Sequence, residues 1–367
     1  MVRYRNAPDF VMMFTVLVLL CFGIIMVFSS SSVWAYYVHK DSLYFLKRQL
    51  VAAFLGLAAM VYFMNYDYWR IKKYEKTILL VMYVLLVAVL IPGIGMKINE
   101  ARRWIGVGSF SVQPSEIAKL GMVVYLSCTL ERKQDDIKNF FKGMVPVLLV
   151  TALTCGLIVI EPHLSAAVLI GMLSMVMLFV AGASIPQMLF LSLAGVILVV
   201  ALIIAEPYRM VRLMSFVNPW EDIRGKGYNI VQSLYALGAG GLLGVGLGKS
   251  RQKFFYLPEP QTDFIFAIIG EELGFLGALF VIFMFSLFIW RGYRAALHAP
   301  DLFGKFMATG ITSLIALQFL IHIAVVTASM PVTGMPLPFI SYGGSSLSIT
   351  LAGIGILLNI TRHLEAK

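Results

Sequence analysis

The chain has 367 residues, of which 60% are hydrophobic and 13% are charged, and its formal net charge is +10 at pH 7. Soluble globular domains have roughly half apolar and about a quarter charged residues, so an ordinary soluble domain is excluded. In a membrane chain, a positive net charge is more typical of basic cytoplasmic loops than of a nucleic-acid surface. We therefore expect a polytopic membrane protein that has no nucleic-acid partner.

Uncharged apolar stretches recur along the whole sequence. A helix needs about 20 apolar residues to cross the hydrocarbon core of a bilayer. Stretches of suitable length predict ten transmembrane helices in one membrane domain, residues 1–367, with an all-α polytopic fold. In chain order the predicted spans are residues 11–35, 48–66, 77–95, 116–130, 143–160, 164–182, 187–205, 263–290, 303–330 and 343–361.

A large extracellular loop, residues 206–262, is predicted between the seventh and eighth spans. Within it, the uncharged segment Tyr228–Gly248 contains six glycines, each of which weakens a helix by about 1 kcal/mol relative to Ala. We expect this segment to be re-entrant or to lie on the surface. Gly240, Gly244 and Gly248 recur every four residues, which on a helix would make one smooth face for another backbone or a lipid chain.

The distribution of basic residues predicts the orientation. Lys and Arg are concentrated in the short loops that are cytoplasmic if both termini lie inside, as the positive-inside rule requires. An eleventh span would move several of these residues to the outer side. We therefore predict ten spans with both termini in the cytoplasm.

Asp263 stands where the long loop gives way to the eighth span. Pro258 and Pro260 fix the approach of the backbone, and Thr262 is placed to act as the helix N-cap, which would leave Asp263 in the first turn. The helix dipole favours the ionised carboxylate, whereas partial burial disfavours it. A carboxylate in this balance is suited to be a general base. The alternative is an acidic residue that only stabilises the start of the helix.

Two further charged groups lie near the fourth span. Arg102 and Arg103 adjoin Trp104, and guanidinium groups bind pyrophosphate oxygens while an indole stacks on a sugar. An interfacial aromatic anchor with basic neighbours would look the same. Glu116 and Lys119 are three residues apart and can form an ion pair, which would serve either function or helix packing.

Polar and irregular segments also accompany the last three spans. Glu271 and Glu272 fall inside the eighth span, which by default indicates function. The segment 331–346 is rich in Pro, Gly and Ser, and irregular backbone at membrane depth persists only beside protein or a wet cavity, so we expect it to line a cavity. His322 is more typical of a hydrogen-bonded residue between helices. No cluster of His, Cys and acidic residues has metal-site spacing.

Motifs along the chain resemble those of one family in the same order. They are Arg103-Trp104-Ile105, Gln113-Pro114-Ser115-Glu116 with Lys119, Asn218-Pro219-Trp220, Tyr256-Leu257-Pro258-Glu259 with Thr262-Asp263-Phe264, Gly270-Glu271-Glu272-Leu273-Gly274 and Ile340-Ser341-Tyr342-Gly343-Gly344-Ser345. Over nearly its whole length the chain thus resembles the SEDS proteins (shape, elongation, division and sporulation), the RodA, FtsW and SpoVE group of bacterial peptidoglycan polymerases. It is most similar to the SpoVE and FtsW branch.

The resemblance implies a ten-helix glycosyltransferase of the bacterial plasma membrane. Its substrate would be lipid II, the undecaprenyl-pyrophosphate-linked disaccharide-pentapeptide, polymerised at the outer face for division, cell shape or the spore cortex. Asp263 matches the acidic residue that the family requires, and would deprotonate the attacking sugar 4-hydroxyl in an inverting reaction. Basic residues or a divalent cation, Mg or Mn, would stabilise the departing pyrophosphate. The implied substrate-binding residues are Arg102, Arg103, Trp104, Glu116, Lys119, Lys249, Arg251, Glu259, Ser345 and Ser346.

The resemblance also implies partners, namely a class B penicillin-binding transpeptidase and other cell-wall synthesis or divisome proteins. Two other classes of function stay open: a lipid II flippase and a non-catalytic scaffold for the transpeptidase. Many charged groups gather toward the outer side instead of running through several spans, which favours the enzyme. Where the family usually has Gln-Pro-Asp, this chain has Glu161-Pro162-His163. The role of that acid is not carried onto His163, and Glu161 can substitute for it.

Overall fold

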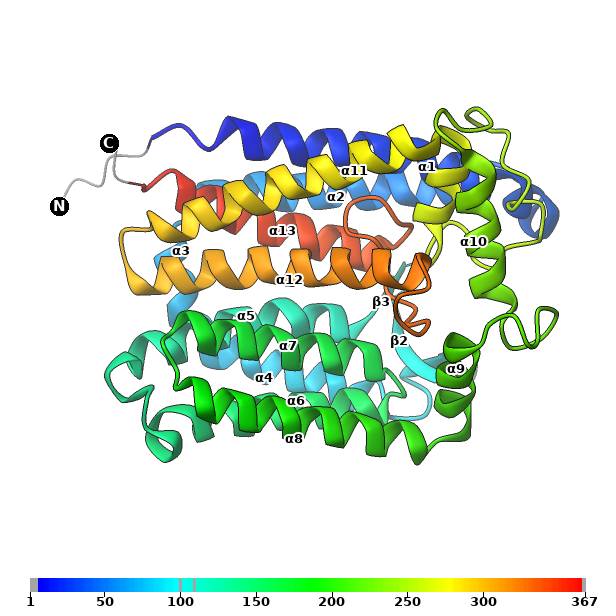
Figure 1. Ribbon diagram of the computed structural model, residues 1–367. Coiled ribbons are helices and arrows are strands. Elements are labelled where there is room, and N and C mark those ends of the chain that lie inside the picture. The colour runs from blue at the N-terminus through cyan, green and yellow to red at the C-terminus, as the bar shows by residue number, and fades with distance from the viewer. Residues whose placement is uncertain (1–5, 99–100, 108–109, 365–367) are drawn as a thin grey trace.

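Helices that lie side by side make up most of the computed structural model, which describes residues 6–98, 101–107 and 110–364. Figure 1 shows the long helices running along one direction of the molecule. They are α1 (Phe10–His39), α2 (Tyr44–Asn65), α4 (Glu75–Ala88), α5 (Pro114–Arg132), α6 (Val145–Ile160), α7 (Leu164–Val180), α8 (Ile185–Ile204), α11 (Ile265–Leu297), α12 (Leu302–Val326) and α13 (Gly344–Thr361). Short helical turns join some of them: α3 (Tyr68–Ile71), η1 (Lys72–Tyr74), η2 (Gln134–Asp136) and η3 (Phe140–Met144).

Each predicted span coincides with one of these long helices, although several ends differ. Within the described residues, seven helices are long and apolar enough to cross a bilayer, so the chain is a multi-pass membrane protein. α4 ends at Ala88 and not at residue 95, because Pro92 lacks a backbone donor and Gly93 turns the chain with a φ of 97°. α11 continues beyond the predicted end, to Leu297.

A small sheet corrects the prediction of an all-α fold. Residues 95–112 contain three antiparallel strands in the order β1–β2–β3, namely β1 (Gly95–Ile98), β2 (Ala101–Val107) and β3 (Phe110–Val112). Ile105 in the middle strand pairs with Gly95 on one side and with Val112 on the other. The sheet therefore fixes the arginine and tryptophan residues of β2, and β3 then leads into α5.

The two ends of the bundle differ. α1 begins and α13 ends at the same end, where the backbone N–H of Asn6 donates to the Arg362 carbonyl at 2.8 Å. The other end carries the sheet and the long loop, which contains α9 (Pro207–Val217) and α10 (Tyr228–Gly240) (Figure 1). The segment expected to be re-entrant or surface-lying thus forms one short helix across this end, followed by irregular backbone.

The glycine-rich segment does not form the single helical face that its spacing predicts. α10 stops at Gly240, and Gly244 and Gly248 have φ values of 77° and 79°, a conformation that favours glycine. The predicted close approach of another backbone does occur at two positions. An added Cβ would clash with the Gly270 carbonyl at Gly240, and with the Glu272 carbonyl at Gly244.

The glycine-rich segment also provides hydrogen-bond partners for the backbone groups at a break in α11. Gly274 interrupts the helix with a φ of 68° and a ψ of −163°. Backbone groups on both sides of the break bond to the glycine-rich segment: the Phe275 N–H donates to the Gly241 carbonyl at 2.8 Å, and the Val245 N–H donates to the Glu271 carbonyl at 3.0 Å. Irregular backbone at this depth is stable because these groups are paired within the protein.

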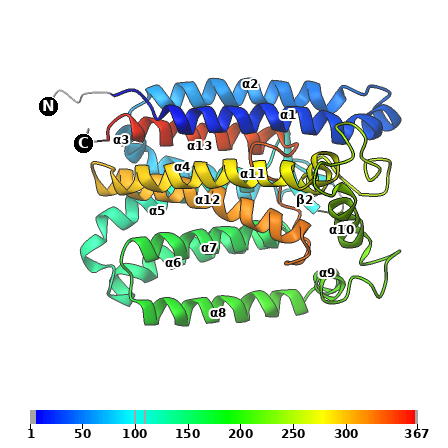
Figure 2. The same cartoon turned by 45° about the horizontal axis from the view of Figure 1, so that its top comes forward.

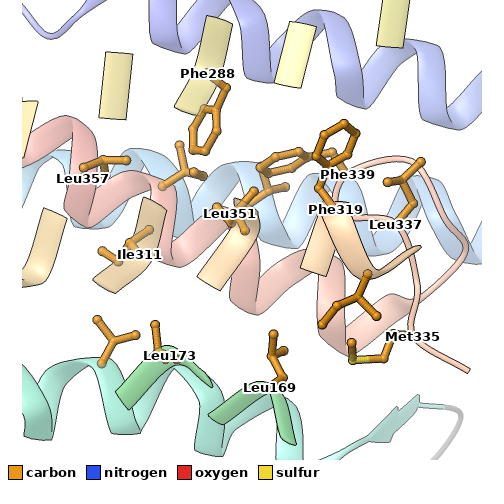
Figure 3. Packing of buried hydrophobic residues seen from close by; sticks show 14 of the residues in the cluster. Leu169, Leu173, Phe288, Ile311, Phe319, Met335, Leu337, Phe339, Leu351 and Leu357 are labelled. Carbon is orange, nitrogen blue, oxygen red and sulfur yellow. The ribbon is translucent and has the colours of Figure 1, made fainter. Parts of the chain in front are cut away.

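The apolar core joins α11, α12 and the chain between α12 and α13 (Figure 3). The rings of Phe285 and Phe319 stack with centroids 4.2 Å apart. Phe339, from the connecting chain, packs against Phe285 at 6.2 Å and against Phe288 at 6.0 Å. The connection is therefore anchored inside the bundle by an aromatic side chain, although it is not helical.

α8 differs from the other long helices. It is described along its whole length, and none of its residues is buried. Figure 2 shows it at the periphery of the bundle, leading into α9. In a bilayer its apolar surface would contact lipid on most sides.

Candidate active site

A cavity of about 1280 Å³ opens at the end of the bundle that carries the sheet and the long loop. This volume exceeds that of a typical small-molecule pocket, which is roughly 300–1,000 Å³. Residues 332–336 and 342–346 border it, which confirms that the irregular segment before α13 lines a cavity. The predicted site residues that line it are Arg103, Trp104, Glu116, Lys119, Glu259, Asp263, Ser345 and Ser346.

Asp263 lies in a turn before α11, which begins two residues later. The predicted N-cap is wrong: Phe264 occupies that position, and the Thr262 hydroxyl donates to the Glu259 carbonyl at 3.1 Å. The Asp263 side chain is half-buried and borders the cavity. It stands beside Gly334, where an added Cβ would lie 3.3 Å from its Oδ2.

The surroundings of Asp263 change its acidity. The pKa of the carboxyl is raised from 3.8 to about 7, chiefly by burial and also by the Glu259 carboxylate, while Arg212 and Arg103 act in the opposite direction. As expected, burial disfavours the ionised carboxylate while a positive field favours it. The positive field comes from guanidinium groups and not from the helix dipole. A group with a pKa near 7 is ionised in part at neutral pH and can still accept a proton, as a general base must.

Arg103 projects from β2 and is held by backbone carbonyls. Its Nε donates to the Glu161 carbonyl at 3.2 Å, and a terminal nitrogen donates to the Pro162 carbonyl. Burial lowers the pKa of the guanidinium, whereas Tyr208, Glu161 and Asp263 raise it. A guanidinium fixed in this way is preorganised to bind an anion.

Glu116 and Lys119 form the predicted ion pair. Nζ of Lys119 lies 2.7 Å from Oε1 of Glu116, and both side chains are 5% exposed. Lys119 also donates to Oε1 of Gln318 on α12 at 3.4 Å. The pair therefore connects two helices and borders the cavity at the same time.

The first residues of α13 also face the cavity. Gly343 occupies the N-cap position, and the Ser345 hydroxyl accepts a hydrogen bond from the backbone N–H of Gln113 at 3.4 Å. Gly343, Ser345 and Ser346 border the cavity, so a helix N-terminus opens into it. Helix N-termini attract anionic groups such as phosphate.

Comparisons with known proteins identify the family. The family model for FtsW, RodA and SpoVE, described as "Cell cycle protein", matches residues 10–366. The chain belongs to this family. Stage V sporulation protein E of Bacillus subtilis is 50% identical over 99% of both chains. The probable peptidoglycan glycosyltransferase FtsW of Trichlorobacter lovleyi is 43% identical over 97% of this chain and 94% of its own length.

Solved structures agree with this assignment. A chain from a peptidoglycan synthase complex, described as coordinating polymerization and crosslinking, has a TM-score of 0.79 and 29% identity over 97% of this chain and 98% of its own. The crystal structure of the rod shape determining protein RodA from Thermus thermophilus has a TM-score of 0.70 and 26% identity over 98% and 99%. The predicted SEDS membership, and the prediction of an enzyme in this glycosyltransferase family, are confirmed.

Three predicted substrate-binding residues of this SEDS protein lie elsewhere. Arg102, Lys249 and Arg251 are not among the described residues that line the cavity. Lys249 and Arg251 are exposed on the segment after α10, and the backbone N–H of Arg251 donates to Glu271 at 2.8 Å. The structure therefore does not bring these three residues to the base, because sequence proximity to a motif does not fix a side chain's direction.

Glu271 and Glu272 are buried and hold the segment after α10 in place. The Ser250 hydroxyl donates to Glu271, and Nζ of Lys253 lies 3.0 Å from Oε1 of Glu272. Ser29 on α1 donates to Glu272 at 2.6 Å. Neither glutamate is among the described lining residues. Both glutamates therefore tie the segment after α10 to α11.

The cavity lining also includes residues that are not among the site residues predicted from sequence. They are Lys47, Arg48, His163, Tyr208 and Arg212. Lys47 and Arg48 stand at the start of the predicted second span, where basic residues are expected at a membrane boundary, and the structure places them in the first turns of α2. Tyr208 and Arg212 lie on α9, whose alternating basic and apolar residues were a usable signal for a surface helix.

Proposed function

We propose that this protein polymerises lipid II into glycan strands at the outer face of the plasma membrane. The observation that carries the proposal is that Asp263, with a raised pKa, lines one cavity together with Arg103, Arg212 and Lys119. A diphosphate leaves as a stabilised anion, so this displacement needs a base and positive charge and no second acid to protonate the leaving group.

In the proposed reaction, Asp263 accepts the proton of the acceptor sugar's 4-hydroxyl while the hydroxyl oxygen bonds to the anomeric carbon of the donor. The bond between that carbon and the diphosphate oxygen breaks, its electron pair leaves with the diphosphate, and the configuration inverts. Arg103 and Arg212, which both lower the pKa of Asp263, would stabilise the departing charge. Lys119, Trp104, Glu116, Glu259, Ser345 and Ser346 are the other substrate contacts in this proposal.

A Mg or Mn ion that arrives with the diphosphate would add positive charge. The described residues contain no group of three or more His, Cys, Asp and Glu that could hold such an ion. The residues that the structure describes therefore do not fit a resident metal.

We also propose ten crossings in one membrane domain, with the start of α1 and the end of α13 on the cytoplasmic side. α1 begins and α13 ends at one end of the bundle, which supports an even number of crossings. The cavity and the loop 206–262 would then lie at the extracellular end. The terminal residues, 1–5 and 365–367, lie outside the described residues.

The partner would be a class B penicillin-binding transpeptidase, acting with other cell-wall synthesis or divisome proteins. The structural relative from a peptidoglycan synthase complex supports this proposal. The identity of 50% with a stage V sporulation protein supports a role in sporulation.

The test is polymerisation by the purified protein given lipid II in detergent, with product length read on a gel. We expect glycan polymer from the native chain and none from Asp263→Asn. Asp222→Asn, which changes an exposed acid of the same loop outside the described cavity lining, is the matched control and should polymerise normally. Transport of lipid II between leaflets by a native chain that makes no polymer would indicate a flippase. Absence of activity with full complementation by Asp263→Ala would indicate a scaffold.

A further inference from the structure

We propose that His163 binds an uncharged oxygen of the substrate's sugar portion by donating a hydrogen bond from Nε2. The proposal rests on the proposed function, because the ligand is the glycan part of a lipid-linked diphosphate. It assigns a substrate-positioning role to the residue that stands where the family usually has an acid. Four observations carry it.

The first is the position of the ring. His163 lies in the turn between α6 and α7, is 8% exposed, and borders the cavity that contains Asp263. The backbone N–H of His163 donates to the Ile158 carbonyl at 3.1 Å, which ties the turn to the end of α6. The turn also supplies the carbonyls that hold Arg103. His163 and Arg103 are therefore placed by one local structure.

The second is the tautomer of the ring. Nδ1 of His163 lies 3.3 Å from Nε2 of Gln113 and 3.2 Å from Oγ of Ser115. An amide nitrogen can only donate, so Nδ1 is the acceptor and carries no proton. In a neutral imidazole the proton is then on Nε2, which becomes a donor.

The third is the freedom of that donor. Among the described residues, the hydrogen-bond partners of the His163 ring are Gln113 and Ser115, and both lie at Nδ1, so Nε2 has no partner there. Nε2 of His322 is fully buried and has no partner among the described residues. Nε2 of His163 is not fully buried. Because His163 borders the cavity, its Nε2–H is accessible to a molecule bound there.

The fourth is the charge around the ring. Burial, together with the positive charges of Arg103 on β2 and Lys119 on α5, lowers the pKa of His163 to about 3. Glu161 provides no compensating negative charge near neutral pH, because burial raises its pKa to about 8. The imidazole therefore stays neutral and donates a hydrogen bond without transferring its proton.

A neutral donor in this place suits a hydroxyl or amide carbonyl oxygen better than a diphosphate. The neighbouring guanidinium and ammonium groups already offer charge-assisted hydrogen bonds, which are the stronger partners for phosphate oxygens. An uncharged sugar oxygen, in contrast, needs one donor of fixed direction. A buried oxygen that loses its donor is left unpaired, which weakens binding.

The first experiment compares polymerisation kinetics of the native protein, His163→Ala, His163→Gln and a control, His298→Ala. His298 is exposed at the opposite end of α11. We expect His163→Ala to raise KM for lipid II about 3- to 10-fold, with kcat changed less than about twofold. His163→Gln keeps an N–H donor near the Nε2 position and should recover most of the native KM. The pH profile should keep its shape in both variants, because the ring does not titrate in the working range.

The second experiment measures binding without catalysis, in an Asp263→Asn background. His163→Ala should weaken the binding of lipid II by the same 3- to 10-fold factor, and should leave undecaprenyl pyrophosphate, which has no sugar, bound as before. Equal losses for both ligands would assign the contact to the diphosphate and overturn the proposal, as would an unchanged KM in His163→Ala. Should His163→Ala fail to fold, Ser115→Ala, which removes one of the bonds that orient the ring, must raise KM to a smaller extent.

The two proposals fail separately. If the native protein makes no polymer but the sugar-dependent loss of binding persists, the polymerase assignment is wrong and the His163 contact stands. If the native protein polymerises and His163→Ala binds and reacts like it, only the His163 contact is wrong.

Discussion

Replacing Asp263 by Asn is expected to stabilise the folded protein while it removes the base. The pKa of Asp263 is raised from 3.8 to about 7, chiefly because burial disfavours the charged carboxylate. At 1.36 kcal/mol per pKa unit, ionising this group costs the folded state about 4 kcal/mol. The side chain keeps part of its surface open to the cavity, so screening by water reduces this cost to roughly 2–4 kcal/mol.

The sign of the pH dependence follows from the raised pKa. Below about pH 4 the carboxyl is protonated in both the folded and the unfolded chain, and it costs nothing. Between about pH 4 and pH 7 the folded state holds a proton that the unfolded state releases, so stability falls as the pH rises. Above about pH 7 the full cost is present. Asn is neutral throughout and does not carry this loss.

Thermal unfolding in detergent, measured from about pH 5 to about pH 8.5, checks this expectation. At roughly 2 °C per kcal/mol, Asp263→Asn should unfold about 4–8 °C above the native protein at the alkaline end, and the difference should shrink by more than half near pH 5. Asp222→Asn, the control in the same loop, should follow the native curve. A lower unfolding temperature for Asp263→Asn at alkaline pH, or parallel curves over the whole range, would refute the reasoning.

Three further outcomes are expected from other parts of the structure. Gly244→Ala and Gly248→Ala both place Ala at a positive φ, but only the Cβ at position 244 clashes with backbone atoms. Thermal unfolding should therefore show a loss of stability of about 3 kcal/mol or more for Gly244→Ala and of roughly 1–2 kcal/mol for Gly248→Ala. Equal losses would contradict the close approach. Glu272→Gln removes the counter-charge of the buried Lys253 and should cost about 3–5 kcal/mol, with faster proteolysis of the segment after α10; unchanged stability would show that the ion pair is not formed. Arg103→Gln removes a charge that lowers the pKa of Asp263, so the pH at half-maximal polymerisation should rise by roughly one unit, and a fall would contradict the assignment.

The spans could be predicted from sequence because each one depends on local composition. A run such as residues 187–205 must be helical in a bilayer whatever surrounds it, since no water is present to satisfy its backbone. The sheet at residues 95–112 could not be predicted in this way. Its strands are short, and the pairing of Gly95 with Ile105 is a contact between residues that hydropathy does not relate.

The candidate site was predicted only where chemistry and position coincide in one motif. Asp263 could be found because it follows a proline-rich loop directly. The turn that holds it and the guanidinium groups beside it could not be predicted. Arg212 and Arg48 come from α9 and α2, and they meet at the cavity only through the tertiary fold. Lys249, in contrast, lies close to the base in sequence and faces elsewhere, because the glycine-rich segment turns away at positive φ.

Hydrogen bonds between two irregular segments of the cavity lining hold Asp263 in place. The Ser341 hydroxyl donates to the Thr262 carbonyl at 2.6 Å and accepts from the Leu337 N–H at 2.8 Å, and the Tyr342 N–H donates to the Gln261 carbonyl at 2.9 Å. These bonds tie the chain after α12 to the chain before α11, so Asp263 is fixed by two connections and not by a helix. A regular helix would have used the same backbone groups internally. The protein therefore combines a desolvated, basic carboxylate with a wide cavity by pairing two non-helical segments with each other.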